Sequence, residues 1–435
     1  MRILSSELKR HIGKQVRVSG WLHKRRDLGK IAFLVLRDRH GLIQIVDEKG
    51  EAEKLHGLQN GTVLTIIGTV VGSEKAPNGV ELHEPSITVD VPVEHISPIE
   101  IDKPIDHASE NHNTLFENRV IGLRNPTERG IFKVQAGVKQ GVREYLMSHD
   151  FTEFNSPKLL SGSTEGGAEV FRLDYFGKEA TLAQSAQFYK QIMVGVFERV
   201  FEINPTYRAE LSYTTRHMTE FLHIDVEMGF IESVGDIVTT TDGLLQYVCE
   251  KTWERHEKEL LALGATKPIL AKQTPVIPLR ELHALYSQVT GQDTTQEKDP
   301  TPAEERWICE YALKEWNSEA VFISEFPASD MKFYHYLNEQ NPAVADRADL
   351  LFRGVEIATL SRREHRYDKL LEQLRAIGGN PEHPGFKYYL MAFKYGLPPH
   401  GGFGMGLERL TQKIIGLGSV KEATLFPRDV NRLAP

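Results

Sequence analysis

Two separate segments of the chain carry residue types that bind phosphate groups. The first holds Arg208 and Glu210, with Arg216, His217 and Phe221 following across a polar loop. Strand-like runs flank this segment on both sides, so we expect an antiparallel hairpin that gathers these side chains. A guanidinium binds a phosphate through two parallel hydrogen bonds, and an aromatic ring can stack on a base. An Arg and a Glu two residues apart also form ordinary solvated pairs, so this segment alone leaves both interpretations open.

The second segment, residues 396–410, is a glycine-rich strand that runs into a helix. Its glycines let a ligand approach the backbone closely, and Arg409 lies where the helix dipole also favours an anion. The segment is not a phosphate loop of the GxxxxGK[ST] type, because no Lys-Ser or Lys-Thr follows the glycines. A tight packing corner between strand and helix would explain the glycines equally well.

A small barrel is expected ahead of these segments. Residues 14–95 contain five strand-like runs separated by turn residues. Such a series predicts a closed or nearly closed β-barrel such as the OB-fold, which commonly binds oligonucleotides, and we assign it to residues 1–104. Residues 2–39 carry 11 Lys or Arg and three acids, although the whole chain has a net charge of −8. A local basic patch of this kind steers polyanions.

A second, larger domain follows a linker. The linker, which we place at residues 105–124, is indicated by prolines and a polar stretch, namely Pro92, Pro98, Pro104 and residues 107–113. A helix capped by Asn125 is then expected to extend to about residue 149. Strand-like runs at 199–203 and 221–228 alternate with helical segments, the longest at 234–262. We therefore expect an α+β domain over residues 125–435.

The composition is that of a soluble globular protein, with 40% hydrophobic and 26% charged residues. No apolar run approaches the roughly 18 to 20 residues that span a bilayer. No apolar core precedes Lys9 and Arg10, so the N-terminus does not resemble a secretion signal. Cys249 and Cys309 are too few for a disulfide framework or a cysteine metal site. These features predict a cytoplasmic protein with no membrane partner.

In combination, the motifs resemble a known enzyme class. The helix and strand that end at Pro157, the hairpin with Arg208 and Glu210, and the strand and helix with Arg409 resemble the three signature motifs of class II aminoacyl-tRNA synthetases. With the barrel in front, nearly the whole chain resembles the subclass that activates aspartate, asparagine or lysine. The match within that subclass is to archaeal-type aspartyl-tRNA synthetases, through residues 163–167, 184–190, 353–357 and 363–366. This resemblance implies an N-terminal OB-fold barrel, an antiparallel sheet flanked by helices, and a homodimer.

The resemblance implies an ATP site and a metal site. Arg208 would bind the α-phosphate, Glu210 the adenine side, Phe221 the adenine ring, Arg216 and His217 the terminal phosphates, and Arg409 the γ-phosphate. Asp349 and Glu356, seven apart on one strand-like segment, would supply hard oxygen ligands for Mg²⁺, with a further oxygen from Thr359. An exposed strand with salt bridges is the alternative interpretation of the acidic pair.

The resemblance also implies a site for L-aspartate, whose second carboxylate needs a bidentate cation and a nearby lysine. Arg363 and Lys190 match the positions that read this group. Gln187 and Asp225 would complete the network, and Glu165 would close over the α-amino group. The amide NH₂ of asparagine would face these two donors without an acceptor, which would cost a few kcal/mol of binding free energy. The competing interpretation of Arg363 is a surface arginine in the basic cluster 362–366.

The barrel is expected to read the anticodon. Phe33 can stack on a base, Gln44 can hydrogen-bond to one, and Arg26 lies alongside, although Phe33 could instead belong to the barrel core. Relatives restricted to tRNA(Asp) tend to carry Trp and Lys where this chain has His23 and Pro77. We therefore expect a non-discriminating enzyme that aspartylates tRNA(Asp) and tRNA(Asn), the second product passing to an amidotransferase.

Three alternatives remain at this point. An asparaginyl-tRNA synthetase would use the same chemistry with a different side-chain reader. An asparagine synthetase of the synthetase-like type would lack the barrel that this chain has. A tRNA-binding paralogue without activity is disfavoured by the presence of Arg208, Glu210, Glu356 and Arg409.

Overall fold

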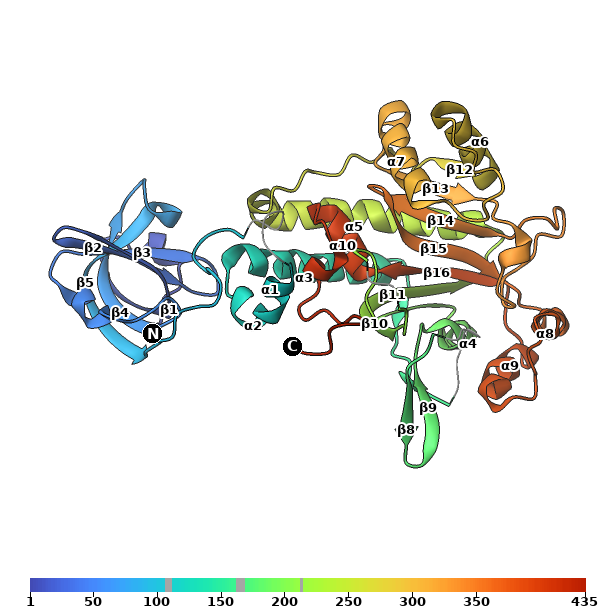
Figure 1. Cartoon of the computed structure of the whole chain (residues 1–435), viewed down its shortest axis with the longest axis horizontal. Helices are drawn as coiled ribbons and strands as arrows, with labels where there is room; N and C mark the ends of the chain where they lie inside the picture. Colours follow the sequence, from blue (N-terminus) through green and yellow to red (C-terminus); the bar gives the residue numbers. More distant parts are fainter. Residues whose placement is uncertain (106–111, 162–168, 212–213) are drawn as a thin grey trace. The chain divides into compact units, whose positions relative to one another are not determined.

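The computed structural model describes residues 1–105, 112–161, 169–211 and 214–435 (Figure 1). By its internal contacts the chain divides into two compact units, Met1–Arg129 and Gly130–Pro435. Within the described ranges, none of the helices combines the length and the apolar character needed to cross a membrane.

The first unit contains the expected barrel. Its five strands close in the order β1-β2-β3-β5-β4, with β1 at Gln15–Leu28, β2 at Ile31–Arg37, β3 at Leu42–Asp47, β4 at Val63–Gly72 and β5 at Val80–Val91. Alternate residues point inward, as the pleat of a strand requires, so Ala32 and Leu34 are buried while Phe33 is partly exposed. Short 3-10 turns are added at Leu8–His11, Glu51–Leu55 and Pro77–Gly79. The predicted OB-fold barrel is confirmed.

The stretch that we expected to be a linker is partly helical. It contains α1 (His112–Glu117) and α2 (Arg119–Gly122), and α3 (Pro126–Ser148) follows. A buried ion pair between Arg119 and Glu128, at 2.7 Å, ties α2 to the first turn of α3. The predicted cap is present, because the Thr127 amide donates to Oδ1 of Asn125 at 2.9 Å.

The second unit is built on an eight-stranded sheet of order β12-β13-β14-β15-β16-β11-β10-β6. The strands are β6 (Thr152–Glu153), β10 (Arg199–Tyr207), β11 (Glu220–Gly229), β12 (Val276–Pro278), β13 (Ala320–Ser324), β14 (Arg347–Phe352), β15 (Val355–Arg363) and β16 (His400–Gly406). Neighbours from β13 to β10 are antiparallel, as expected, whereas the outermost pairs β12/β13 and β6/β10 are parallel. A separate three-stranded sheet comprises β7 (Leu159–Leu160), β8 (Arg172–Tyr175) and β9 (Lys178–Leu182).

Helices flank the large sheet. They are α4 (Gln187–Phe197), α5 (Val234–Ala262), α6 (Leu279–Thr290), α7 (Pro302–Trp316), α8 (Tyr367–Ala376), α9 (Lys387–Lys394) and α10 (Leu407–Ile415), with short 3-10 turns at Ala328–Asp330, Pro384–Phe386 and Val420–Ala423. The long helix predicted at 234–262 is confirmed, and a capping box of Ser233 and Asp236 fixes its start.

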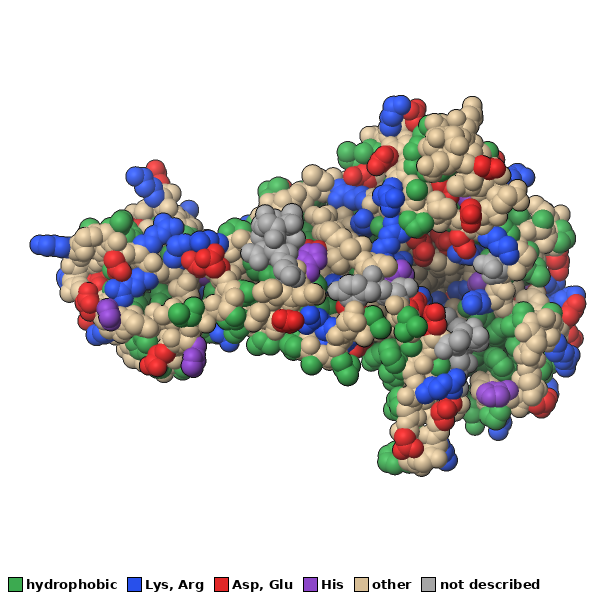
Figure 2. Space-filling model, viewed as in Figure 1, with side chains coloured by type: hydrophobic (Ala, Val, Ile, Leu, Met, Phe, Trp, Pro, Cys, Tyr) green, Lys and Arg blue, Asp and Glu red, His purple; other side chains and the backbone are tan. Residues whose placement is uncertain are grey.

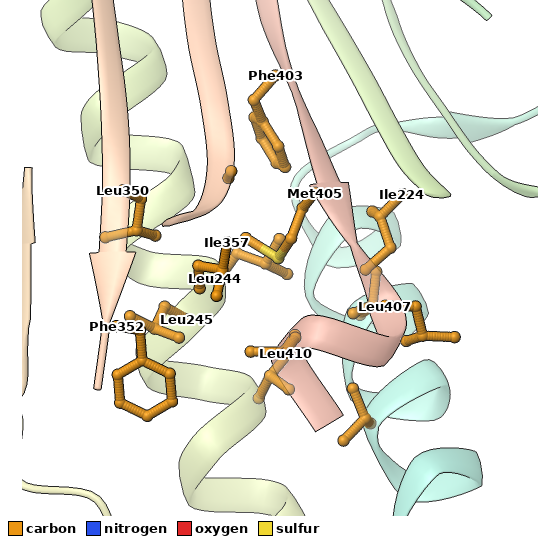
Figure 3. Packing of buried hydrophobic residues seen from close by; sticks show 14 of the residues in the cluster. Ile224, Leu244, Leu245, Leu350, Phe352, Ile357, Phe403, Met405, Leu407 and Leu410 are labelled. Atoms are coloured by element: carbon orange, nitrogen blue, oxygen red, sulfur yellow. The ribbon is translucent and has the colours of Figure 1, made fainter. Parts of the chain in front are cut away.

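The main core lies between one face of this sheet and helices α3, α5 and α10. Figure 3 shows Leu244 and Leu245 of α5 packed near Leu350 and Phe352 of β14, with Leu410 of α10 close by. These side chains are fully buried, which stabilises the fold by about 1.5 to 3 kcal/mol for each. The opposite face of the same strands is therefore free to carry polar side chains.

Candidate active site

The polar face of the sheet forms a cavity of about 450 Å³. On β11, Ile224 and Val226 enter the core, so His223, Asp225 and Glu227 point to the other face. In Figure 2 the larger unit is hollowed where acidic, basic and histidine side chains gather. Twelve of the side chains predicted from the sequence line this cavity, namely Gln187, Lys190, Arg208, Glu210, Arg216, His217, Phe221, Asp225, Glu356, Thr359, Arg363 and Arg409.

Arg208 and Glu210 follow β10 at the mouth of the expected hairpin. The Arg208 guanidinium lies over the ring of Phe221 at 5.4 Å, and its Nη1 is 3.9 Å from Oε1 of Glu210. Nε2 of His217 is 3.8 Å from the other oxygen of Glu210. Burial lowers the pKa of His217, and the neighbouring arginines lower it further despite Glu210. These residues form a cluster on a cavity wall with an aromatic ring beside a guanidinium, an arrangement that suits a nucleotide.

Arg216 is held by a residue that the sequence did not single out. Its Nη1 donates to Oε2 of Glu305 on α7 at 2.7 Å, and its Nη2 donates to the carbonyl of Gly354 at 3.2 Å. Burial raises the pKa of Glu305. Glu305 lies 89 residues along the chain from Arg216, so no local pattern could have connected the two.

Arg409 lies in the first turn of α10, as predicted. Its Nη1 donates to the carbonyl of Glu356 at 3.0 Å and lies 4.0 Å from the Glu356 carboxylate. The guanidinium thus enters the cavity beside Glu356.

The acidic pair does not lie on one strand, and that expectation was wrong. Asp349 belongs to β14 and Glu356 to β15, and a two-residue turn joins the strands. Asp349 pairs across the ladder with Thr359, whose hydroxyl donates to Oε1 of Glu356 at 3.1 Å. Three candidate oxygen ligands are therefore brought together by the hairpin.

Asp349 is buried and bound by Arg347, which donates to both carboxylate oxygens at 3.2 and 2.7 Å. Burial and the nearby charge of Glu356 raise the pKa of Asp349 to about 7, although Arg347 opposes the shift. Repulsion between two carboxylates is what a shared divalent cation would relieve. The described residues hold no cluster of three or more His, Cys, Asp or Glu suited to a metal ion. A cation here would therefore also need ligands from a bound phosphate or water.

The inner end of the cavity is a buried ion-pair network. Nζ of Lys190 lies 3.0 Å from Asp225 and 3.5 Å from Glu227, and Arg363 donates from Nε to Glu227 at 3.0 Å. Arg363 is only 4% exposed, so its interpretation as a surface arginine is wrong. Burial acts to raise the pKa of Asp225, but His223 and Lys190 outweigh it and hold that pKa well below its usual range.

Glu227 is the second residue that the sequence analysis missed. It lies two residues after Asp225, so the two-residue alternation of β11 could have placed both on one face. The network also includes Ser361, which accepts a hydrogen bond from Nη1 of Arg363, and Tyr334, whose ring lies 5.7 Å from the guanidinium.

The remaining predicted residues lie elsewhere. Glu165 falls outside the described residues. Arg26 and Phe33 face each other across the β1/β2 ladder, outside the barrel core. Gln44 is partly buried on β3 and donates to Glu81 at 2.8 Å. Because Phe33 lies outside the barrel core, its ring is available at the surface of the barrel.

His23 and Pro77 differ in their surroundings. His23 is 6% exposed, and its Nδ1 has no hydrogen-bond partner within the part of the chain that the structure describes. Burial lowers the pKa of His23, and the charge of Arg37 lowers it further. Pro77 begins the short turn between β4 and β5 and is partly exposed.

Both parts of the chain match known families. Residues 111–430 match the family described as tRNA synthetases class II (D, K and N), and residues 16–90 match the OB-fold nucleic acid binding domain. The aspartate–tRNA(Asp/Asn) ligase of Thermus thermophilus is 43% identical over 438 residues, which cover 100% of both chains. The aspartate–tRNA(Asp) ligase of Pyrococcus abyssi is 38% identical over 99% of both chains.

A solved structure agrees with these matches. Asparaginyl-tRNA synthetase from Pyrococcus horikoshii, complexed with asparaginyl-adenylate, superimposes with a TM-score of 0.92 at 30% identity and covers 100% of both chains. Because a family model matches residues 111–430 and a relative is 43% identical over the whole chain, the chain belongs to the class II tRNA synthetase family of the D, K and N type.

Proposed function

We propose that this protein is an aspartate–tRNA ligase that activates L-aspartate with ATP and transfers it to tRNA(Asp) and tRNA(Asn). One observation carries the proposal: a single cavity joins a cluster of arginines at its outer end to two buried cations, Lys190 and Arg363, at its inner end. The outer cluster suits a triphosphate, and the inner pair suits a carboxylate.

The reaction needs positioning more than a protein nucleophile. The α-carboxylate of aspartate attacks the α-phosphate of ATP in line, and pyrophosphate leaves. Arg208 stabilises charge on the α-phosphate, and Phe221 and Glu210 hold the adenine. Arg216, His217 and Arg409 bind the terminal phosphates from two sides of the cavity. A hydroxyl of the terminal ribose of the tRNA then attacks the carboxyl carbon of the resulting adenylate, an ester bond to the tRNA forms, and AMP leaves.

Asp349, Glu356 and Thr359 are the residues that would hold a Mg²⁺ bound together with ATP. Glu356 and Thr359 line the cavity, whereas Asp349 is buried and does not line it, so phosphate and water would supply the remaining ligands that Mg²⁺ retains in such sites. When bound, the ion would neutralise phosphate charge. Arg347, which itself lines the cavity, holds Asp349 through both carboxylate oxygens.

Aspartate is favoured over asparagine by the charge of the inner pocket. Arg363 and Lys190 present hydrogen-bond donors only. The amide NH₂ of asparagine is also a donor, so it would face these groups in a buried site without an acceptor. We expect a selectivity of a few kcal/mol from this mismatch. We move Gln187 and Asp225 from the side-chain network expected from the sequence to the α-ammonium group, because an amide oxygen and a carboxylate accept hydrogen bonds from an ammonium. Glu165 would join them there.

The barrel supports binding of an anticodon loop. Phe33 on its surface can stack on a base, with Arg26 opposite it and Gln44 on the neighbouring strand. His23 is buried, so we propose that it affects the choice of tRNA through the side chains around it, whereas the partly exposed Pro77 can act directly. Aspartate attached to tRNA(Asn) would then be converted by an amidotransferase.

We also propose a cytoplasmic homodimer. Large apolar side chains are exposed at the end of α3, on β7 and at the end of α4, namely Met147, Leu159, Val196 and Phe197. This region includes the Pro157 segment where synthetases of this class associate. Both cysteines are buried free thiols, which suits a reducing compartment.

Aspartate-dependent exchange of labelled pyrophosphate into ATP tests this proposal without tRNA. We expect exchange with aspartate and at least a hundredfold lower kcat/KM with asparagine, in line with the few kcal/mol above. Exchange driven by asparagine would identify an asparaginyl-tRNA synthetase. No exchange with either amino acid, from protein that binds tRNA, would identify a paralogue without activity.

A further inference from the structure

Behind Gln187, a chain of buried hydrogen bonds continues away from the cavity into the protein. Nε2 of Gln187 donates to Oε1 of Gln191 at 2.9 Å. Nε2 of Gln191 lies 2.9 Å from Nε2 of His400, and Nδ1 of His400 lies 2.8 Å from the carbonyl of Pro398. Tyr389 donates its hydroxyl to the same oxygen of Gln191 at 3.1 Å. Gln191, His400 and Tyr389 are at most 1% exposed, and they do not line the cavity.

The direction of every bond in this chain follows from its far end. A backbone carbonyl only accepts, so Nδ1 of His400 must carry the proton that is donated to Pro398. Burial lowers the pKa of His400 to about 4, so the ring is neutral and its Nε2 can only accept. The atom of Gln191 that faces the ring is therefore its NH₂ group, and its carbonyl oxygen points toward Gln187.

The same reasoning fixes the amide of Gln187. Its NH₂ group must face the Gln191 oxygen, so its own oxygen, Oε1, is the end left for a ligand in the cavity. Among the described residues, the side-chain amide of Gln187 makes its hydrogen bond through Nε2 alone. An acceptor that lines the same cavity as the carboxylate of Asp225 matches an ammonium group and would repel a carboxylate.

We propose that Gln191 and His400 are positioning residues that hold the Gln187 amide with its oxygen toward the α-ammonium group of the amino acid substrate. They touch neither substrate nor ATP and act only through Gln187. This role rests on the proposed function. It extends that function by naming the buried residues that keep the oxygen of the Gln187 amide, and not its NH₂ group, facing the ammonium site.

Steady-state pyrophosphate exchange on the full-length chain tests the role. Gln191→Met keeps the side-chain length and removes both polar ends. We expect the KM for aspartate to rise at least tenfold, while the KM for ATP stays within about twofold. Tyr389→Phe removes one donor but leaves the bond to His400, so we expect at most a threefold rise in the KM for aspartate.

Gln135→Met is the matched control, because Gln135 is also a buried glutamine, and it donates to the carbonyl of Ala423 at 2.7 Å. The KM for aspartate should not change in this variant. An unchanged KM for aspartate in Gln191→Met, with the parent protein active, would overturn the positioning role alone. If the parent protein shows no aspartate-dependent exchange, the proposed function fails and this role fails with it.

Nitrogen NMR of the histidine rings in the parent protein provides a second readout, which does not depend on the activity of any variant. The signal of His400 is assigned by its absence in His400→Gln or in His400→Asn. We expect a neutral ring protonated at Nδ1. A ring protonated at Nε2 would reverse the direction of the whole chain and overturn the proposal.

Discussion

Arg363 donates from Nε to Oε1 of Glu227 at 3.0 Å, and both side chains are buried. Oε2 of the same carboxylate lies 3.5 Å from Nζ of Lys190. One carboxylate thus holds both cations that we assign to the side chain of aspartate. The pocket is organised before the substrate arrives, which lowers the entropy cost of binding.

Arg363→Gln should abolish aspartate selectivity and weaken the fold. We expect kcat/KM for aspartate to fall by more than a hundredfold, because the variant removes the bidentate cation and leaves Glu227 short of a partner. Breaking a buried pair also costs about 3 to 5 kcal/mol of stability, so the melting temperature should fall. Arg362→Gln is the control, because Arg362 is the neighbouring arginine and its ion pair with Asp346 is long, at 3.7 Å. Equal losses in both variants would contradict a specific role for Arg363.

Arg216→Gln should act on ATP alone. Loss of its charge from the terminal phosphates should raise the KM for ATP by about tenfold, as expected for one charge-assisted contact, with the KM for aspartate unchanged. Arg172→Gln, on the exposed strand β8, is the control. A parallel rise in both KM values would mean that the hairpin had collapsed.

Glu408 should make stability depend on pH. Burial raises the pKa of its carboxyl group to about 7, although the Leu222 amide donates to it at 3.0 Å. A carboxyl whose pKa is higher in the folded state favours folding fully below its unfolded pKa, and this contribution is lost as the pH rises through about 7. Glu408→Gln should therefore gain stability relative to the parent, by up to a few kcal/mol, between pH 5 and pH 8. Melting temperatures across this range check the sign, and an advantage that shrinks with rising pH would contradict it.

Phe33→Ala should separate the two half-reactions. Loss of one stacked base costs about 1 to 3 kcal/mol, so kcat/KM for tRNA should fall roughly 5- to 100-fold. Pyrophosphate exchange should be unaffected. Ile67→Ala, which removes another exposed apolar side chain from the barrel, should change neither reaction. A loss of exchange in Phe33→Ala would show that the barrel ring affects the catalytic unit.

The parts of the fold that depend on local signals were predictable from the sequence. The helix expected at 234–262 has the bounds of α5, and the alternation of apolar residues predicted the barrel strands. The hairpin of β14 and β15 was missed, although Gly354 in its turn was a signal in the sequence. A two-residue hairpin turn requires positive φ, which glycine adopts readily, and Arg353 and Gly354 have φ values of 48° and 79°.

Non-local relationships were not predictable in this way. The parallel pairing of β12 with β13 and the contact of Glu305 with Arg216 join segments far apart in the chain. The same holds for the Gln191 and His400 contact, which spans 209 residues. Predicted residues on β11, β15 and α10 nevertheless met in one cavity. The strands β15, β16 and β11 are neighbours in one sheet, and α10 directly follows β16.

Charging of purified tRNA(Asp) and tRNA(Asn) with labelled aspartate, and separately with labelled asparagine, tests the central claim most directly. We expect aspartate on both tRNAs at comparable efficiency and asparagine on neither. In the double variant His23→Trp and Pro77→Lys, charging of tRNA(Asn) should fall relative to tRNA(Asp). Aspartate on tRNA(Asp) alone in the parent protein would contradict relaxed reading of the anticodon, and asparagine on tRNA(Asn) would contradict the assignment of the pocket around Arg363.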